Sequence, residues 1–343
     1  MKKDTHNIIT DNLGIALPTL ILTSLLVGYF FGGVMSQERY ESFLKSFRIL
    51  RNPTERSQLI NPLIGSSSNP ATDIGFFVDE KREIVKFLEK EKRNNALEDY
   101  AFYVRDLNSG FWFGENESAS FFPASLFKLP LAIAVYAQAE DNPAFLKKQV
   151  VYSKEFSSGD VETPTSLIVG KVYTVEQLVE IMLVQSDNAA KNTILSLLDV
   201  KYLQEIFNIA HLTDPTKTAT YTVSTREYSL FLRVLYGSSF LNEEHSELLL
   251  KMLASSSFTE GLVSGVPDGV TVAHKYGIFQ QIENRKGVDV RYQFLHDCGI
   301  VYHTQRPYVV CVMTKGKDEK VLSGVIAKVS SILYGYTERG AVD

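Results

Sequence analysis

The sequence is poor in the residues that cross-link proteins or bind metals. Its 343 residues include only two cysteines, too few for a disulfide scaffold, and no Cys-x-x-Cys pair indicates zinc. The six histidines show no His-Glu-x-x-His motif or other paired spacing, so we predict no metal and no cofactor. Basic residues are not in excess, because 35 Lys and Arg face 40 Asp and Glu. A nucleic-acid partner is therefore not expected.

The hydrophobic and charged residues of the chain are in the proportions of a folded protein. Hydrophobic residues make up 45% of the chain and charged residues 22%, which supports a sizeable core in one large domain or two smaller ones. We find no internal repeat, so the function has to be sought in local motifs.

Residues 13–35 contain no charged side chain and are numerous enough to cross a bilayer as a helix. A cleaved signal peptide and a buried helix are the alternatives. No Ala-containing cleavage site follows the apolar run, which favours an uncleaved anchor. We therefore predict a short tail (1–12), a transmembrane anchor (13–35), a stalk and linker (36–71) and a globular domain (72–343).

The globular domain reads as strands at both ends with helices between. Helices are expected at 79–95, 125–139, 174–184 and 318–334, and strands at 99–106, 111–113, 270–276, 291–294, 299–302 and 308–314. Thr174 and Gln177 form a capping-box pattern. This order predicts an α+β fold in which the two ends of the domain share one sheet and the middle forms a helical lobe.

Ser125-Leu126-Phe127-Lys128 begins an apolar helix. Lys128 lies one turn after Ser125, so its amine can reach the serine oxygen. A lysine among apolar residues has a lowered pKa and can serve as a base. A helix cap followed by a solvated lysine is the simpler interpretation, which the apolar surroundings of Lys128 oppose.

Two further motifs are weak when each is taken alone. Ser186-Asp187-Asn188 separates two helices, as many turns do. Lys275-Tyr276-Gly277 ends a strand, where lysine and glycine are common.

The three motifs in this order resemble the penicillin-recognising serine hydrolases, and within them the class A β-lactamases. The resemblance covers roughly residues 78–338, including Gly269–Lys275. It implies the three-layer α/β/α domain of β-lactamases and DD-peptidases, with an antiparallel sheet and a helical lobe.

The resemblance also implies roles for individual residues. Ser125 would be the nucleophile that forms an acyl-enzyme, Lys128 would take its proton and Ser186 would protonate the leaving nitrogen. The predicted substrate-binding residues are Asn188, Lys275, Tyr276, Gly277 and Ile278, with the backbone N–H groups of Ser125 and Ile278 as the oxyanion hole. Asn188 would also hold Lys128, and Lys275 would also bind Ser186. Asp187 would have a structural role.

The sequence departs from the class A pattern in two places. Tyr276 replaces the Thr or Ser that normally follows the lysine of the third motif. The segment 211–224 contains no glutamate, although class A enzymes place their deacylating Glu-x-x-Leu-Asn segment there. We therefore expect acylation of Ser125 followed by slow hydrolysis.

Two functions remain open at this stage. One is a membrane-anchored hydrolase acting on a β-lactam or on the D-Ala-D-Ala end of a peptidoglycan peptide. The other is a non-catalytic module that binds such molecules through a degenerate site. The joint presence of all three motifs favours the enzyme.

The expected substrates lie outside the cytoplasm, so we predict a single-pass protein of the cell membrane with an extracytoplasmic catalytic domain. The flanking charges point the other way: Lys2 and Lys3 precede the anchor, whereas five basic residues follow it before residue 57. Long domains cross membranes largely regardless of charge, so we give the substrate argument more weight.

Two pairs of residues near the C-terminus carry structural predictions. Cys298 and Cys311 flank a turn centred between residues 304 and 305. They could face each other across a hairpin, but two buried free thiols are favoured because that geometry strains a disulfide. His296 and Asp297 are expected to form a satisfied structural pair.

Overall fold

The computed structural model describes residues 73–156, 165–218, 220–285, 287–304 and 306–339. All of them belong to one compact unit, Leu50–Asp343. The predicted tail, anchor and stalk lie outside the described residues and stay predictions. Within the described ranges, no helix is both long enough and apolar enough to span a bilayer.

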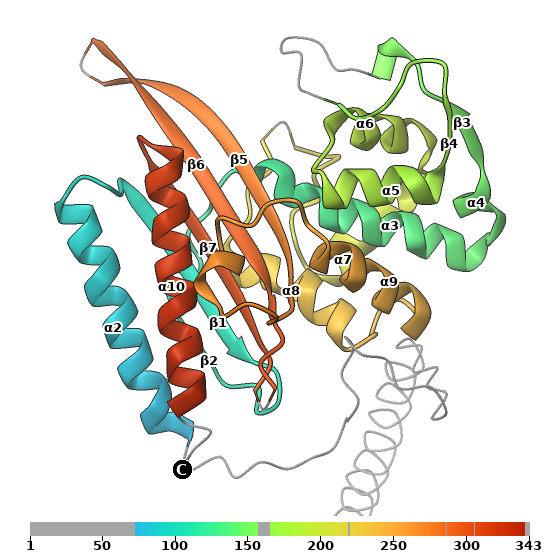
Figure 1. Ribbon diagram of the computed structural model, residues 1–343. Helices are drawn as coiled ribbons and strands as arrows, with labels where there is room; N and C mark the ends of the chain where they lie inside the picture. The colour runs from blue at the N-terminus through green and yellow to red at the C-terminus, as the bar shows by residue number, and fades with distance from the viewer. Residues whose placement is uncertain (1–72, 157–164, 219, 286, 305, 340–343) are drawn as a thin grey trace, which may run out of the picture. The chain divides into compact units, whose positions relative to one another are not determined.

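Five strands form one antiparallel sheet: β1 (Asp99–Asp106), β2 (Trp112–Glu115), β5 (Val272–Arg285), β6 (Val288–Val301) and β7 (Tyr308–Gly316). Their order is β2-β1-β7-β6-β5. Strand β1 lies beside β7, so the two ends of the domain share one sheet as the sequence predicts (Figure 1).

The hairpin of β5 and β6 is longer than predicted. The two strands expected at 291–294 and 299–302 are one continuous strand, and β5 continues past residue 276 to Arg285. The missed part lacks apolar alternation and is mostly polar after Phe279, and its Ile282 is 60% exposed. Backbone pairing continues the ladder through this part, out to Arg285 opposite Val288.

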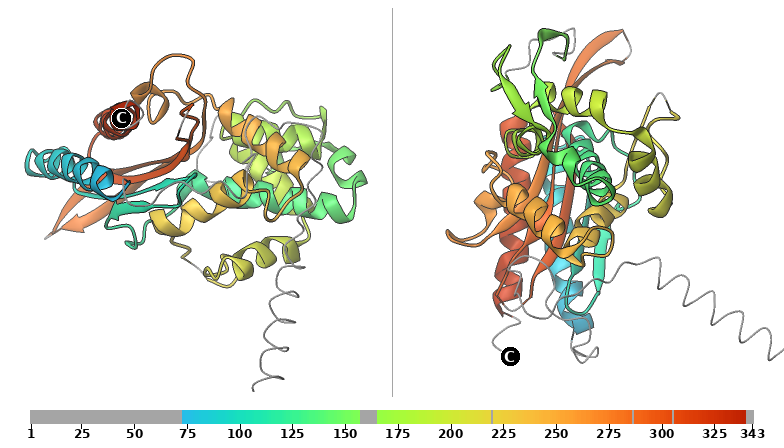
Figure 2. Two further views of the ribbon diagram at one scale, coloured as in Figure 1. Left: turned by 90° about the horizontal axis from the view of Figure 1, so that it is seen from below. Right: turned by 90° about the vertical axis from the view of Figure 1, so that its right-hand side faces the viewer.

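Helices α2 (Asp73–Arg93) and α10 (Glu319–Arg339) cover one face of the sheet, as both views in Figure 2 show. Their apolar stripes, which include Ile84, Leu88 and Ile326, are fully buried against sheet residues such as Val312. Burying such side chains stabilises each helix on the sheet by about 2 kcal/mol per residue.

The opposite face carries α8 (Thr225–Tyr236) and a helical lobe. The lobe consists of α3 (Lys128–Asp141), α4 (Ala144–Lys147), α5 (Val175–Val184), α6 (Asn188–Leu197), α7 (Val200–Ile209), α9 (Glu243–Ala254) and a small hairpin of β3 (Gln149–Val151) and β4 (Val172–Thr174). The resulting three layers confirm the predicted α/β/α arrangement with an antiparallel sheet.

Capping boxes begin two of these helices. Thr174 and Gln177 cap α5, and Ser224 and Glu227 cap α8, with each side chain bonded to the other residue's backbone N–H. Both pairs are visible in the sequence because a Thr or Ser followed three residues later by Gln or Glu satisfies two N–H groups at a helix start.

The prediction of two free thiols is wrong. Cys298 of β6 and Cys311 of β7 form a disulfide. They are direct partners in the antiparallel register, and both side chains are fully buried. The turn centre calculated from the sequence is therefore correct, and the register does not slip.

The expected pairing of His296 with Asp297 is also wrong. The Nε2 atom of His296 lies 3.1 Å from the carbonyl oxygen of Phe122, whereas Asp297 bonds the Nδ1 atom of His274 at 2.7 Å and the N–H of Leu262 at 2.9 Å. Successive residues of a strand point to opposite faces of the sheet, so these neighbours find separate partners.

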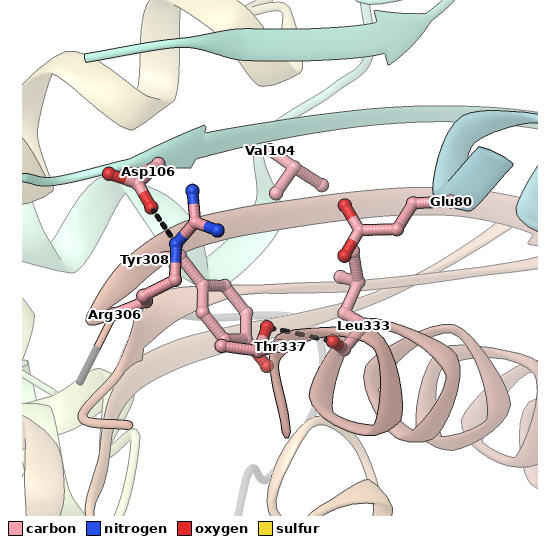
Figure 3. Close-up of a pocket in the computed structure, with 7 residues that line it drawn as sticks. All are labelled: Glu80, Val104, Asp106, Arg306, Tyr308, Leu333 and Thr337. Atoms are coloured by element: carbon pink, nitrogen blue, oxygen red, sulfur yellow. Dashed lines mark hydrogen bonds and ion pairs between the residues drawn. The ribbon is translucent and has the colours of Figure 1, made fainter. Parts of the chain in front are cut away.

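A small cavity lies between the sheet and the layer of α2 and α10 (Figure 3). It is lined by Glu80, Val104, Asp106, Arg306, Tyr308, Leu333 and Thr337. The Nε of Arg306 lies 3.1 Å from the carboxylate of Asp106, which also accepts two backbone N–H groups of the following turn. This buried ion pair ties the end of β1 to the segment before β7.

Candidate active site

Ser125 lies in a short 3₁₀ turn, Ala124–Phe127, that leads directly into α3. The preceding Ala124 has a φ of +49°, in the left-handed region that residues with a Cβ seldom adopt. Such a conformation costs about 1 kcal/mol or more, so the surrounding contacts hold this turn in place. The turn places Ser125 on the wall of a pocket.

Lys128 is the first residue of α3 and is 1% exposed. Its Nζ donates to the Oγ of Ser125 at 3.0 Å and to the Oγ of Ser186 at 3.1 Å, and it also contacts the carbonyl oxygen of Ser186. The lysine therefore connects the first motif to the second.

Lys275 approaches the same serine from strand β5. Its Nζ donates to the Oγ of Ser186 at 2.9 Å and to the carbonyl oxygen of Tyr276 at 3.0 Å, and its side chain is fully buried. The Ser186 hydroxyl thus lies between two amines, and Ser186 itself has a φ of +57°. The three motifs meet at this hydroxyl.

Burial, and to a smaller extent the nearby charge of Lys191, lower the pKa of Lys128 to about 7, while the charge of Asp187 opposes the shift. Burial, together with the charge of Lys128, also lowers the pKa of Lys275 well below its ordinary value. Among the described residues, no carboxylate forms an ion pair with either lysine. At neutral pH a substantial fraction of Lys128 is a neutral amine that can accept a proton.

Gly277 allows strand β5 to approach the serine turn. A Cβ at this position would lie 2.9 Å from the carbonyl oxygen of Pro123 and 3.1 Å from the backbone nitrogen of Ser125. The next residue, Ile278, lines the same pocket as Ser125. The predicted pair of backbone N–H donors, at Ser125 and Ile278, therefore comes from two segments in close contact.

The second motif has a structural residue and a pocket residue. Asp187 caps α6, accepting the N–H of Ala190 at 2.9 Å, and also accepts the hydroxyl of Thr165 at 2.7 Å. These bonds agree with its predicted structural role. Asn188 lines the pocket, but the predicted contact with Lys128 is wrong: among the described residues the amine of Lys128 bonds Ser125 and Ser186 instead.

Tyr276 is half-buried beside the site. Its ring stacks on Phe258 with centroids 4.3 Å apart, and the Nζ of Lys275 lies 4.1 Å from the centre of the Tyr276 ring. Tyr276 does not line the pocket that contains Ser125. The ring packs against the lysine as a cation–π partner, a contact that a Thr or Ser could not supply.

The pocket has a volume of about 410 Å³. Its walls are Phe122, Pro123, Ala124, Ser125, Phe127, Lys128, Asn188, Lys191, Pro215, Thr218, Tyr221, Ile278 and Phe279. No acid occurs among these described lining residues. Mostly apolar walls with a few polar groups are typical of small-molecule sites.

Lys191 is a pocket residue that the motifs did not indicate. It lies three residues after Asn188 in helix α6, and both side chains line the pocket. The spacing carries a usable signal, because residues i and i+3 share a helix face. The Ser-Asp-Asn motif ends at Asn188, so the motif by itself does not include Lys191.

The family model described as the β-lactamase enzyme family matches residues 81–337, a range that contains all three motifs. The chain belongs to this family. It is accordingly a serine hydrolase of the β-lactamase type. No curated protein matches the chain.

Solved structures of β-lactamases and of a penicillin-binding protein share the fold of this family member. A β-lactamase from Chitinophaga pinensis has 18% identity and a TM-score of 0.64, covering 76% of this chain and 99% of its own. The extended-spectrum β-lactamase TLA-1 has 17% identity and a TM-score of 0.63, with coverages of 76% and 98%. A PBP-A mutant in an acyl-enzyme complex with penicillin G has 21% identity and a TM-score of 0.61, with coverages of 75% and 97%.

Proposed function

We propose that the protein is a membrane-anchored hydrolase that forms an acyl-enzyme on Ser125 and deacylates slowly. Its substrate would be a β-lactam or the D-Ala-D-Ala end of a peptidoglycan peptide. The observation that carries this proposal is the buried network in which Lys128 contacts both Ser125 and Ser186, and Lys275 contacts Ser186.

In the proposed reaction, the neutral amine of Lys128 accepts the hydroxyl proton of Ser125. The Oγ then attacks the substrate carbonyl carbon, and the carbonyl oxygen becomes an oxyanion held by the N–H groups of Ser125 and Ile278. As the carbon–nitrogen bond breaks, Ser186 gives its proton to the leaving nitrogen and regains one from Lys128. The preformed contacts among these groups reduce the reorganisation that the step requires.

The remaining predicted residues would bind the substrate. Asn188 faces the pocket and would hold the amide of the acyl side chain. Lys275 would bind the substrate carboxylate through its amine, and the ring of Tyr276 packs on that lysine. Gly277 allows the close approach that places Ile278 beside Ser125.

Slow deacylation is supported by the composition of the pocket. A general base must lie within hydrogen-bond reach of the attacking water. The segment 211–224 contributes Pro215, Thr218 and Tyr221 to the walls, none of which is an acid. The carboxylate of Asp214 in that segment bonds Thr216 and Lys217 instead.

An extracytoplasmic position of the domain, anchored through residues 13–35, is part of the proposal. The disulfide between Cys298 and Cys311 supports it, because structural disulfides persist in oxidising compartments and are rare in the cytosol.

Intact-mass analysis of the full chain with penicillin G tests the function. We expect a covalent adduct that persists on the wild type and on a Ser239→Ala control, and that is absent from Ser125→Ala. Rapid drug loss without an adduct would show efficient deacylation and contradict the argument from the missing acid. If no adduct forms and the drug is not consumed, the result would favour the non-catalytic binding module.

A further inference from the structure

Lys191 is a cation in the catalytic pocket that the proposed reaction leaves without a role. It lines the pocket together with Ser125, Lys128 and Asn188. Its side chain is partly buried, and burial lowers the pKa of its amine. Among the described residues, Lys191 forms no ion pair and its Nζ donates no hydrogen bond.

An unpaired lysine in this position is unfavourable for the free protein. It places a positive charge near Lys128, which is itself buried, and the two like charges repel each other. Within the described chain the pocket walls contain no carboxylate that could compensate either charge. An anion entering the pocket from solution would supply the missing partner.

The position of Lys191 on α6 indicates which part of a substrate would face it. Asn188 and Lys191 lie one turn apart and both line the pocket. If Asn188 holds the amide of the acyl side chain, as the proposed function requires, then the side chain beyond that amide extends along α6 toward Lys191. The leaving group lies on the other side of the scissile bond, toward Ser186.

We propose that Lys191 is a specificity-determining residue that binds a carboxylate on the acyl group of the substrate. The inference rests on the proposed function for the placement of the acyl group. The substrate class is then a β-lactam or peptide whose acyl side chain carries a negative charge, in contrast to the neutral acyl groups that the apolar walls alone would suit.

Two penicillins provide a matched test. Carbenicillin is penicillin G with one carboxylate added to the carbon that bears the phenyl ring, so the pair differs by the group in question. The acylation efficiency of the full chain is measured with each drug by intact mass over time. The informative quantity is the ratio of carbenicillin to penicillin G, because the charge of Lys191 also acts on Lys128 and changes the absolute rate with both drugs.

We expect the wild type to favour carbenicillin and Lys191→Met to lower the ratio by about tenfold, the scale of a close charge pair at a binding site. Lys191→Arg keeps the charge and should keep most of the preference. Lys328→Met removes an equal charge from the exposed side of α10 and should leave the ratio unchanged. Equal ratios in the wild type and Lys191→Met would overturn the inference.

A binding measurement separates this inference from the proposed function. Equilibrium binding of both drugs by calorimetry, in Ser125→Ala and in Ser125→Ala combined with Lys191→Met, does not require acylation. If neither drug acylates the wild type, the proposed function fails. A preference for carbenicillin that disappears with Lys191 would still support the carboxylate site, and no such preference would refute it.

Discussion

At the scale of single residues, the proposed reaction uses the neutral amine of Lys128 as its base, so we expect the protonation of Lys128 to decide whether Ser125 can react. Burial and the charge of Lys191 hold its pKa at about 7, so the amine is increasingly neutral above that pH. We expect the acylation efficiency with penicillin G to rise about tenfold per pH unit below pH 7 and to level off above it. Acylation rates measured between pH 5 and 9 would test this rise, and rates that do not change across pH 7 would contradict the role of Lys128 as base.

The same network predicts the direction in which Lys191 moves the profile. Removing a neighbouring positive charge makes protonation of Lys128 less costly and raises its pKa. In Lys191→Met, the pH at which the acylation rate reaches half of its plateau should therefore be higher than in the wild type. In Lys191→Arg it should stay near that of the wild type.

Gly277 gives a second prediction at this scale. In Gly277→Ala the new methyl group would lie 2.9 Å from the carbonyl oxygen of Pro123, so β5 must move away from the serine turn. Because small displacements of reacting groups are costly, we expect acylation to slow at least about tenfold. Stability should fall by only about 1–3 kcal/mol.

Gly324→Ala is the matched control for this substitution. Gly324 lies in α10, and a Cβ there would meet no atom within 4 Å. Alanine should be neutral or stabilising in that helix. Unchanged acylation in Gly277→Ala would show that the close contact between β5 and the serine turn is not required.

At the scale of elements, the buried ion pair of Asp106 and Arg306 makes a larger contribution than an exposed one. Asp106 is 3% exposed, and Arg306→Met would leave its charge without a cation. The two backbone N–H groups that it accepts remain, so we expect a loss of about 2–3 kcal/mol rather than the full cost of an isolated buried charge. Urea unfolding of the two proteins measures the difference.

The control is the ion pair of Arg82 and Asp79 in α2, whose atoms are only 2.7 Å apart but whose side chains are 72% and 62% exposed. Arg82→Met should change the unfolding free energy by less than about 0.5 kcal/mol. Equal losses at Arg82 and Arg306 would show that burial does not determine how much these ion pairs contribute.

The sequence predicts elements well where local chemistry determines them. The capping box at Thr174 gives a correct helix start, and apolar alternation gives the strands of the sheet core. The prediction fails where backbone pairing with a neighbouring strand, rather than the side-chain pattern, sets the length of a strand, as in β5 beyond Tyr276. It fails again at Cys298 and Cys311, because whether two facing thiols join depends on strand geometry that a sequence does not contain.

The candidate site is predictable to a similar extent. The resemblance carried by the three motifs identifies Ser125, Lys128, Ser186 and Lys275, and the structure brings these four side chains into one network. Lys191 and the aromatic walls enter the site through the packing of the helical lobe. No single motif contains them: the helical spacing from Asn188 is the one sequence signal for Lys191, and the aromatic walls become visible only when the lobe is assembled.

At the scale of the whole molecule, the proposed side of the membrane is the claim that the flanking charges oppose. Five basic residues follow the predicted anchor before residue 57, which by the charge rule favours a cytoplasmic domain. A buried disulfide and a substrate outside the cytoplasm favour the opposite side. Two reporters fused after Asp343 decide between them: alkaline phosphatase, which needs an oxidising compartment, and a fluorescent protein that matures only in the cytoplasm.

We expect an active phosphatase fusion and a dark fluorescent fusion. Fusing the same reporters after residue 12, before the predicted anchor, should reverse both signals and shows that each reporter works in these cells. The reverse pattern at Asp343 would place the domain in the cytoplasm, away from peptidoglycan and in a compartment where the Cys298–Cys311 disulfide would not persist. This one measurement therefore tests the compartment of the domain, on which the persistence of the disulfide and access to the proposed substrate both depend.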